Sequence, residues 1–218
     1  MYLLTYIAYS LIHFEREFWS LSKKQLKNEK HIFTTEQLSR FDFAELILYS
    51  VFLFVCGVVG DTFDQRKILT LALMGLGVAF ALLGLPGTLD WYSQPYFIVI
   101  MAVIGTLNAL LWPCFIAILG CWFPKKSRGF LAGLWATCNN TGNIFGIQLG
   151  TQLLKVFEDW QWLLYTIGIV VFLWGIVLWL FLIPDPEDIG ITIQEYTEEE
   201  ALIKVASKPE FYESLHYH

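Results

Sequence analysis

The sequence predicts an all-α integral membrane protein, built as a bundle of six transmembrane helices. Of the 218 residues, 56% are hydrophobic and 16% are charged, whereas about a quarter of the residues of a soluble domain are charged. The apolar residues also gather in six runs with short polar segments between them. Because a helix needs about 20 predominantly apolar residues to cross a bilayer, the composition indicates that a lipid bilayer surrounds the protein.

The six expected helices follow one another with short connections. The first is short for a complete crossing, but an amphipathic pattern continues through residues 15–21. A polar stretch at 23–40 precedes the second helix, and Thr34 or Thr35 with Gln37 is a plausible helix-start signal there. Pro86 and Gly87 are expected to end the third helix. The expected spans cover about residues 2–14, 43–60, 68–85, 94–122, 129–156 and 162–183.

Two regions are expected along the chain. Residues 1–183 form the six-helix bundle, and no linker divides them. Residues 184–218 are acidic and polar and contain no apolar run long enough to cross a bilayer. We expect this C-terminal tail to lie in water or against another protein.

The motifs of enzymes and nucleic-acid-binding proteins are missing from the sequence. It has no Gly-x-Ser-x-Gly, no glycine loop followed by Lys-Ser/Thr that could hold phosphates, and no zinc-type histidine pair. We therefore expect no enzyme activity, no catalytic residues, no metal and no cofactor. Blocks of lysine and arginine of the kind that bind nucleic acid are also absent, so no nucleic-acid partner is expected.

The turn between the second and third expected helices carries a cluster of charges. It reads GVVGDTFDQRK from Gly57 to Lys67. The glycines allow two helix ends to approach. Four charged residues could then form an ion-pair latch at the membrane boundary: Asp61, Asp64, Arg66 and Lys67. The alternative is that these are ordinary interfacial charges at helix ends.

This turn resembles the signature loop of the major facilitator superfamily, roughly G-x-x-x-D-R-x-x-R-[RK]. Gly57, Asp61 and Arg66 stand where the motif has its glycine, its acid and its later arginine. Thr62 stands where the pattern usually has a base, so one charge of the latch is lost.

Further motifs narrow the resemblance to the organophosphate:phosphate antiporters, and within them to the sugar phosphate exchangers. These motifs are Phe33-Thr34-Thr35-Glu36-Gln37-Leu38, Trp112-Pro113, Trp122-Phe123, Arg128-Gly129, Gly133, Trp135, Asn143, Gly146, Asp159-Trp160-Gln161-Trp162 and residues 184–190. The resemblance covers about residues 5–191. It implies the fold of the N-terminal half of a major facilitator transporter, and a function in exchanging a phosphorylated sugar for inorganic phosphate.

The resemblance also points to ligand-binding residues on the first helix. The segment from His13 to Glu17, HFERE, is similar to the exchangers' H-x-S-R-K, so Arg16 is the implied phosphate ligand and His13 lies beside it. A guanidinium forks onto phosphate oxygens, and an ionisable residue inside a span is a site hypothesis by default. The alternative is that Arg16 lies at the helix end and extends to the interface. Glu15 and Glu17 could neutralise the site.

Amide side chains mark the fifth expected helix. Asn139 and Asn143 either face a central cavity as part of the binding site or join helices by hydrogen bonds. The second interpretation fits the row Gly142, Gly146 and Gly150, which allows close backbone approach.

Transporters of this superfamily resemble two six-helix halves with the ligand held between them, and the sequence matches the first half. Three interpretations stay open: a half-transporter that pairs with a second half, a non-transporting structural subunit of a larger membrane complex, or a fragment of a full-length transporter. Expected partners are therefore the bilayer, other membrane subunits or a second half-transporter, with phosphorylated sugar and inorganic phosphate as ligands. The resemblance suggests an intracellular membrane such as the endoplasmic reticulum, and a subunit of an organellar complex could equally lie in the mitochondrial inner membrane.

Overall fold

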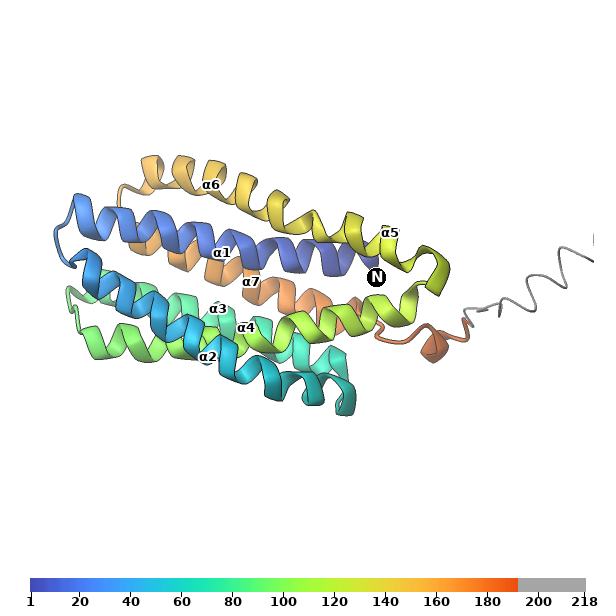
Figure 1. Ribbon diagram of the computed structural model, residues 1–218. Coiled ribbons are helices and arrows are strands. Elements are labelled where there is room, and N and C mark those ends of the chain that lie inside the picture. Colours follow the sequence, from blue (N-terminus) through green and yellow to red (C-terminus); the bar gives the residue numbers. More distant parts are fainter. Residues whose placement is uncertain (192–218) are drawn as a thin grey trace, which may run out of the picture.

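The computed structural model describes residues 1–191, except for the side chains of residues 57–62 and 125. In this part, long helices run side by side as a bundle, with no strand (Figure 1). The helices are α1 (Tyr2–Asn28), α2 (Thr35–Thr62), α3 (Gln65–Leu89), α4 (Gln94–Trp122), α5 (Lys125–Ala136), α6 (Cys138–Phe157), α7 (Trp160–Phe181) and the 3-10 helix η1 (Pro186–Ile189). The six expected helical regions are all present, which confirms the all-α bundle.

Three of the helices, α3, α4 and α7, are long and apolar enough by length and composition to cross a membrane. The others in the described part are more polar along their length. α1 is the clearest case, because it is one helix of 27 residues, and the expected end of the first span at residue 14 is wrong. The polar residues beyond Phe14 are helical too, and those at positions 16, 20 and 23 lie on one helix face that lines a cavity.

The expected end of the third helix at Pro86-Gly87 is also wrong. α3 continues to Leu89, and Asp90 closes it in the left-handed conformation, with φ 50° and its N–H bonded to the Pro86 carbonyl. A Cβ on Gly87 would lie 2.8 Å from both the Trp160 ring and the Gln161 Cβ atom. Packing of this turn against α7 therefore outweighs the hydrogen bond that proline removes.

The fifth expected span, 129–156, is two helices. α5 ends and α6 begins at Thr137, whose N–H and hydroxyl both bond the Leu134 carbonyl, at 3.2 and 2.7 Å. The Tyr6 hydroxyl of α1 lies 3.1 Å from the Thr137 hydroxyl and 2.8 Å from that of Thr141. α1 thus supports the break from the side. Such contacts with side chains of neighbouring helices make a break in a membrane helix tolerable, because they help to satisfy the polar groups that lose their helical hydrogen bonds.

The helices pack mainly in pairs: α3 against α7, α2 against α4, and α1 against α6. The glycine row of α6 forms the last of these contacts. A Cβ on Gly142 would lie 2.6 Å from the His13 Cβ atom, and one on Gly150 would lie 2.6 Å from the Leu21 side chain. The expectation that this row serves helix packing is confirmed.

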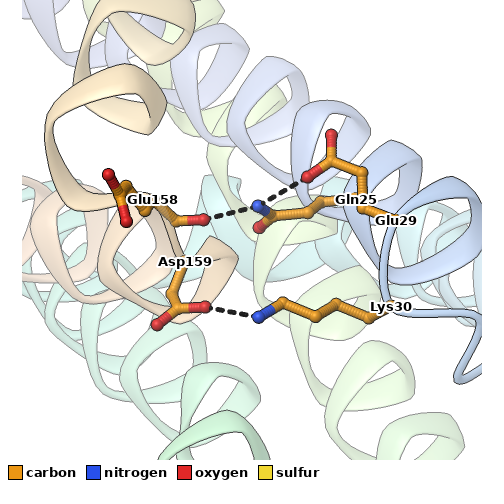
Figure 2. A network of polar contacts seen from close by, with 5 residues as sticks. All are labelled: Gln25, Glu29, Lys30, Glu158 and Asp159. Atoms are coloured by element: carbon orange, nitrogen blue, oxygen red, sulfur yellow. Dashed lines mark hydrogen bonds and ion pairs between the residues drawn. The ribbon is translucent and has the colours of Figure 1, made fainter.

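At one end of the bundle, a polar network connects α1 to the turn between α6 and α7 (Figure 2). The Gln25 amide donates to the Glu158 carbonyl at 2.6 Å and to the Glu29 carboxylate at 3.0 Å. Beside it, the Lys30 ammonium lies 2.8 Å from the Asp159 carboxylate. This network fixes the end of α1 relative to α7. At the other end, η1 lies in the predicted tail, and the rest of that tail, 192–218, falls outside the described residues.

Candidate functional site

A cavity of about 380 Å³ lies between α1, α2, α4 and α6; we call it the charged cavity. All four residues that the sequence singled out as phosphate-contacting candidates line it: His13, Arg16, Asn139 and Asn143. The α1 residues face it together because positions 13, 16, 20 and 23 follow one stripe of a helix. The tertiary structure therefore brings the candidates of two distant helices to one place.

Arg16 lies in the middle of α1 and not at its end, since the helix continues for a further 12 residues to Asn28. This overturns the structural premise of the alternative in which Arg16 sits at a helix end. The side chain is exposed to the charged cavity, and within the described part of the chain it forms no hydrogen bond or ion pair. Its five N–H donors are thus available to a ligand.

The second base of the charged cavity, Lys23, differs because it is already paired. Its ammonium lies 2.6 Å from the Asp42 carboxylate of α2, and both side chains are largely shielded, at 24% and 34% exposure. The Trp19 indole donates to the same carboxylate at 2.9 Å. Lys23 therefore adds little net positive charge to the cavity.

Carboxyl groups surround Arg16 on two helices. Glu15 is completely buried, and the Asn108 side chain of α4 lies beside its carboxyl group. Glu17 and, from α2, Glu45 also line the charged cavity. The sequence indicated Glu15 and Glu17 but missed Lys23, Asp42 and Glu45. Helical spacing could have predicted these residues. Lys23 follows Arg16 by seven residues and so lies on the same face of α1, and Asp42 and Glu45, three apart, share a face of α2.

His13 and the two asparagines complete the polar lining. His13 is 6% exposed, its ring centroid lies 5.1 Å from that of Tyr9, and its Nε2 atom has no hydrogen-bond partner among the described residues. The Asn143 side-chain amide donates to the side-chain Oδ1 atom of Asn139 at 3.0 Å. Because these asparagines are four apart, they form one polar strip of α6 beside the glycines that pack on α1. The glycines of α6 therefore pack on α1, and its two amides line the cavity with a hydrogen bond to each other that stays within α6.

The residues of the expected latch are only partly described. The side chains of residues 57–62 lie outside the described part of the chain, so the part of the latch that involves Asp61 stays a prediction. The Lys67 ammonium lies 3.5 Å from the Asp64 carboxylate. The Arg66 guanidinium donates from Nε to the Trp179 carbonyl of α7 at 2.7 Å and lies 5.2 Å from the Trp179 ring centroid. Its Nη2 also contacts that carbonyl. Arg66 thus connects the start of α3 to the end of α7.

Known proteins similar to this chain are phosphate-ester transporters by name. "Putative glycerol-3-phosphate transporter 3" of Arabidopsis thaliana is 33% identical, over 85% of this chain and 39% of its own length. "Sugar phosphate exchanger 3" of Mus musculus is 31% identical, over 98% of this chain and 49% of its own length, which confirms the expected resemblance to sugar phosphate exchangers. The chain spans less than half the length of these relatives.

Solved structures support the fold. Two crystal structures of a bacterial homolog of the human lysosomal transporter Spinster, both inward-facing, superpose with TM-scores of 0.66 and 0.71. Each covers 97% of this chain and about half of its own, at 17% and 14% identity. A family model, "Major Facilitator Superfamily", matches residues 24–210. Because this family model matches most of the chain and the six expected helical regions are present, the chain belongs to the major facilitator superfamily.

Proposed function

We propose that this chain forms the N-terminal half of a carrier that exchanges a phosphorylated sugar for inorganic phosphate. The observation that carries the proposal is Arg16, which lies in the middle of α1, faces the charged cavity and has no hydrogen bond or ion pair within the described residues. A guanidinium and a phosphate form bidentate, charge-assisted hydrogen bonds. The names of the relatives support the same ligand class, because glycerol 3-phosphate and sugar phosphates are all phosphate esters.

Within this proposal, His13, Asn139 and Asn143 assist Arg16. The asparagine amides and the histidine ring can donate or accept hydrogen bonds to phosphate oxygens and to hydroxyl groups. The three side chains line the same cavity as Arg16. Their role is to orient the ligand after the arginine has attracted it.

The second wall of the ligand site is proposed to come from another six-helix bundle. In secondary transporters the ligand lies between two repeats near the bilayer midplane, and access alternates as one repeat moves against the other. The expected partner is therefore a second half-transporter, on the same polypeptide or a separate one. The proposed location is an intracellular membrane, the endoplasmic reticulum or the mitochondrial inner membrane.

A second candidate function is a structural subunit of a larger membrane complex that no longer transports. The observation in its favour is the acidic lining of the charged cavity, because Glu15, Glu17 and Glu45 line it together with Arg16. Carboxylates near the guanidinium lower its attraction for phosphate. The other membrane subunits of such a complex would then be the partners.

Binding of inorganic phosphate to the chain in lipid nanodiscs distinguishes the two candidates. Arg16→Ala should weaken phosphate binding by about 10- to 150-fold, because hydrogen bonds to charged groups contribute about 1.5–3 kcal/mol. The matched control is Arg40→Ala, which removes an exposed arginine paired with Glu36 outside the cavity and should leave binding unchanged.

Two results would contradict the carrier. One is equal phosphate binding by the unmodified chain and by Arg16→Ala. The other is no phosphate binding by the unmodified chain together with its purification in an assembly of unrelated membrane subunits, which would favour the structural role.

A further inference from the structure

A second pocket, of about 310 Å³, lies beside the charged cavity where α1, α2 and α4 meet the break between α5 and α6. We call it the aromatic pocket; it is lined by Tyr9, Tyr49, Leu53, Trp112, Ala136 and Asn139. Asn139 also lines the charged cavity. A small pocket of about 120 Å³ has Tyr9, Tyr49 and Arg16 in its walls. The aromatic pocket therefore adjoins the two pockets that Arg16 lines.

The aromatic rings of this pocket are held in place from behind. The Tyr9 ring centroid lies 5.4 Å from that of Trp112, 5.1 Å from that of Trp135 and 5.6 Å from that of Phe115. Trp135 is 1% exposed, and its indole N–H donates to the Thr5 hydroxyl at 3.1 Å. Trp112 keeps 38% of its surface exposed. Trp135 and Phe115 thus hold the Tyr9 ring in place, and the Trp112 ring beside it keeps an exposed surface.

Polar groups frame these apolar faces. Within the described residues, the Trp112 indole N–H and the hydroxyls of Tyr9 and Tyr49 make no hydrogen bond. Asn139 adds an amide at the border with the charged cavity. A sugar ring presents C–H groups on its faces and hydroxyls at its edges, so it matches flat aromatic surfaces edged by hydrogen-bonding groups. An acyl chain would leave those polar groups unsatisfied.

We propose that the aromatic pocket binds the sugar ring of a ligand whose phosphate is held by Arg16. This inference rests on the proposed function and names the organic part of its substrate. The volume lies at the lower end of the range of about 300–1,000 Å³ for small-molecule pockets. A hexose fills more of such a pocket than glycerol does, so the carrier selects sugar phosphates over glycerol 3-phosphate and inorganic phosphate.

Competition binding to the chain in lipid nanodiscs tests this selection, with glucose 6-phosphate, glycerol 3-phosphate, inorganic phosphate and phosphocholine as probes. The unmodified chain should bind glucose 6-phosphate most tightly. Trp112→Ala should weaken glucose 6-phosphate binding by about three- to tenfold, since an aromatic contact contributes about 0.5–1.5 kcal/mol beyond its buried area, and should leave inorganic phosphate binding unchanged.

Trp112→Phe should keep most of the preference, and it serves as the folded variant if the alanine substitution disturbs the bundle. The matched control is Trp162→Ala on α7, a tryptophan of similar exposure, 46%, that packs on Phe157 and Tyr165 instead. It should leave all four affinities unchanged.

Each remaining outcome overturns a different statement. Equal affinity for glucose 6-phosphate and inorganic phosphate would overturn the sugar pocket and leave the proposed phosphate site intact. Tighter binding of phosphocholine would replace the sugar with an ammonium group, which aromatic rings also bind. Failure of all four probes to bind would overturn the proposed function and this inference together.

Discussion

Two helix contacts in this bundle, α3 with α7 and α1 with α6, use the same means of close approach and differ in what surrounds it. At α3–α7, a Cβ on Gly77 would lie 2.7 Å from the Phe172 Cβ atom, and one on Gly175 would lie 2.8 Å from the Met74 side chain. At α1–α6, a Cβ on Gly142 would meet His13 at a similar distance. In both pairs, glycine lets the helix backbones touch.

The side chains next to these contacts decide what each pair can do. α3 buries apolar side chains such as Leu69, Leu73 and Leu76, each at 0% exposure. The α1–α6 pair instead presents Arg16 and Asn143 to the charged cavity. Because lipid tails are as apolar as leucine, membrane helices are held together by close packing and interhelical hydrogen bonds and not by a hydrophobic driving force. Ionisable groups are costly there and are a site hypothesis by default. The α3–α7 pair is therefore a packing contact, and the α1–α6 pair is the contact that carries the proposed binding site.

The largest expected effect is on the packing contact between α3 and α7. Gly77→Ala places a methyl group within 3 Å of the Phe172 backbone nitrogen, at 2.8 Å, where no flexible side chain can yield. Overpacking of this kind costs about 1–3 kcal/mol, so we expect a lower unfolding temperature and a smaller monodisperse fraction in size-exclusion chromatography. The control is Gly120→Ala in α4, where nothing lies within 4 Å of the added atom. Equal behaviour of the two variants would contradict the packing argument.

A smaller effect is expected on phosphate binding in the charged cavity. Asp42→Asn removes the charge that neutralises Lys23 while keeping an acceptor for the Trp19 indole. Lys23 then adds a free positive charge to the cavity, and inorganic phosphate should bind about two- to fivefold more tightly, in line with the energy of a single shielded ion pair. Glu36→Gln, which frees the exposed Arg40 outside the cavity, should change nothing. Unchanged or weaker binding by Asp42→Asn would show that Lys23 does not act on the ligand.

The smallest effect concerns the network that connects α1 to α7 (Figure 2). The hydrogen bond from Lys30 to Asp159, and then the Asp159 charge, raise the pKa of Lys30 above its ordinary value of 10.5. The folded chain therefore holds this proton more tightly than the unfolded chain. The resulting stability is fully present below pH 10.5 and is lost as the pH rises through the raised value.

Asp159→Asn should thus lower the unfolding temperature slightly at neutral pH, by an amount that corresponds to less than about 1 kcal/mol, because both side chains are more than a third exposed. The difference from the unmodified chain should disappear once Lys30 is deprotonated. A deficit of the same size on both sides of that pH range would mean that the pair acts through packing and not through charge.

Much of the fold could be predicted from the sequence because apolar runs of the right length are set by the bilayer. The errors occur where neighbours override a local signal. Pro86 does not end α3, since Gly87 packs on Trp160, and Thr137 divides the fifth span where the Tyr6 hydroxyl contacts it. α1 extends past residue 14, where its polar positions 16, 20 and 23 face the charged cavity.

The sequence by itself determined the class of the protein, its superfamily, and Arg16, His13, Asn139 and Asn143 as candidates, since composition, motif spacing and residue chemistry are local properties. The tertiary structure decided that these four side chains line one cavity, that Lys23 is paired with Asp42, and that Tyr9, Tyr49 and Trp112 enclose a pocket beside Arg16. Those facts depend on how each helix is rotated against its neighbours. That rotation is set by interlocking side chains and glycine contacts between helices distant in the chain, which no periodicity within one helix specifies.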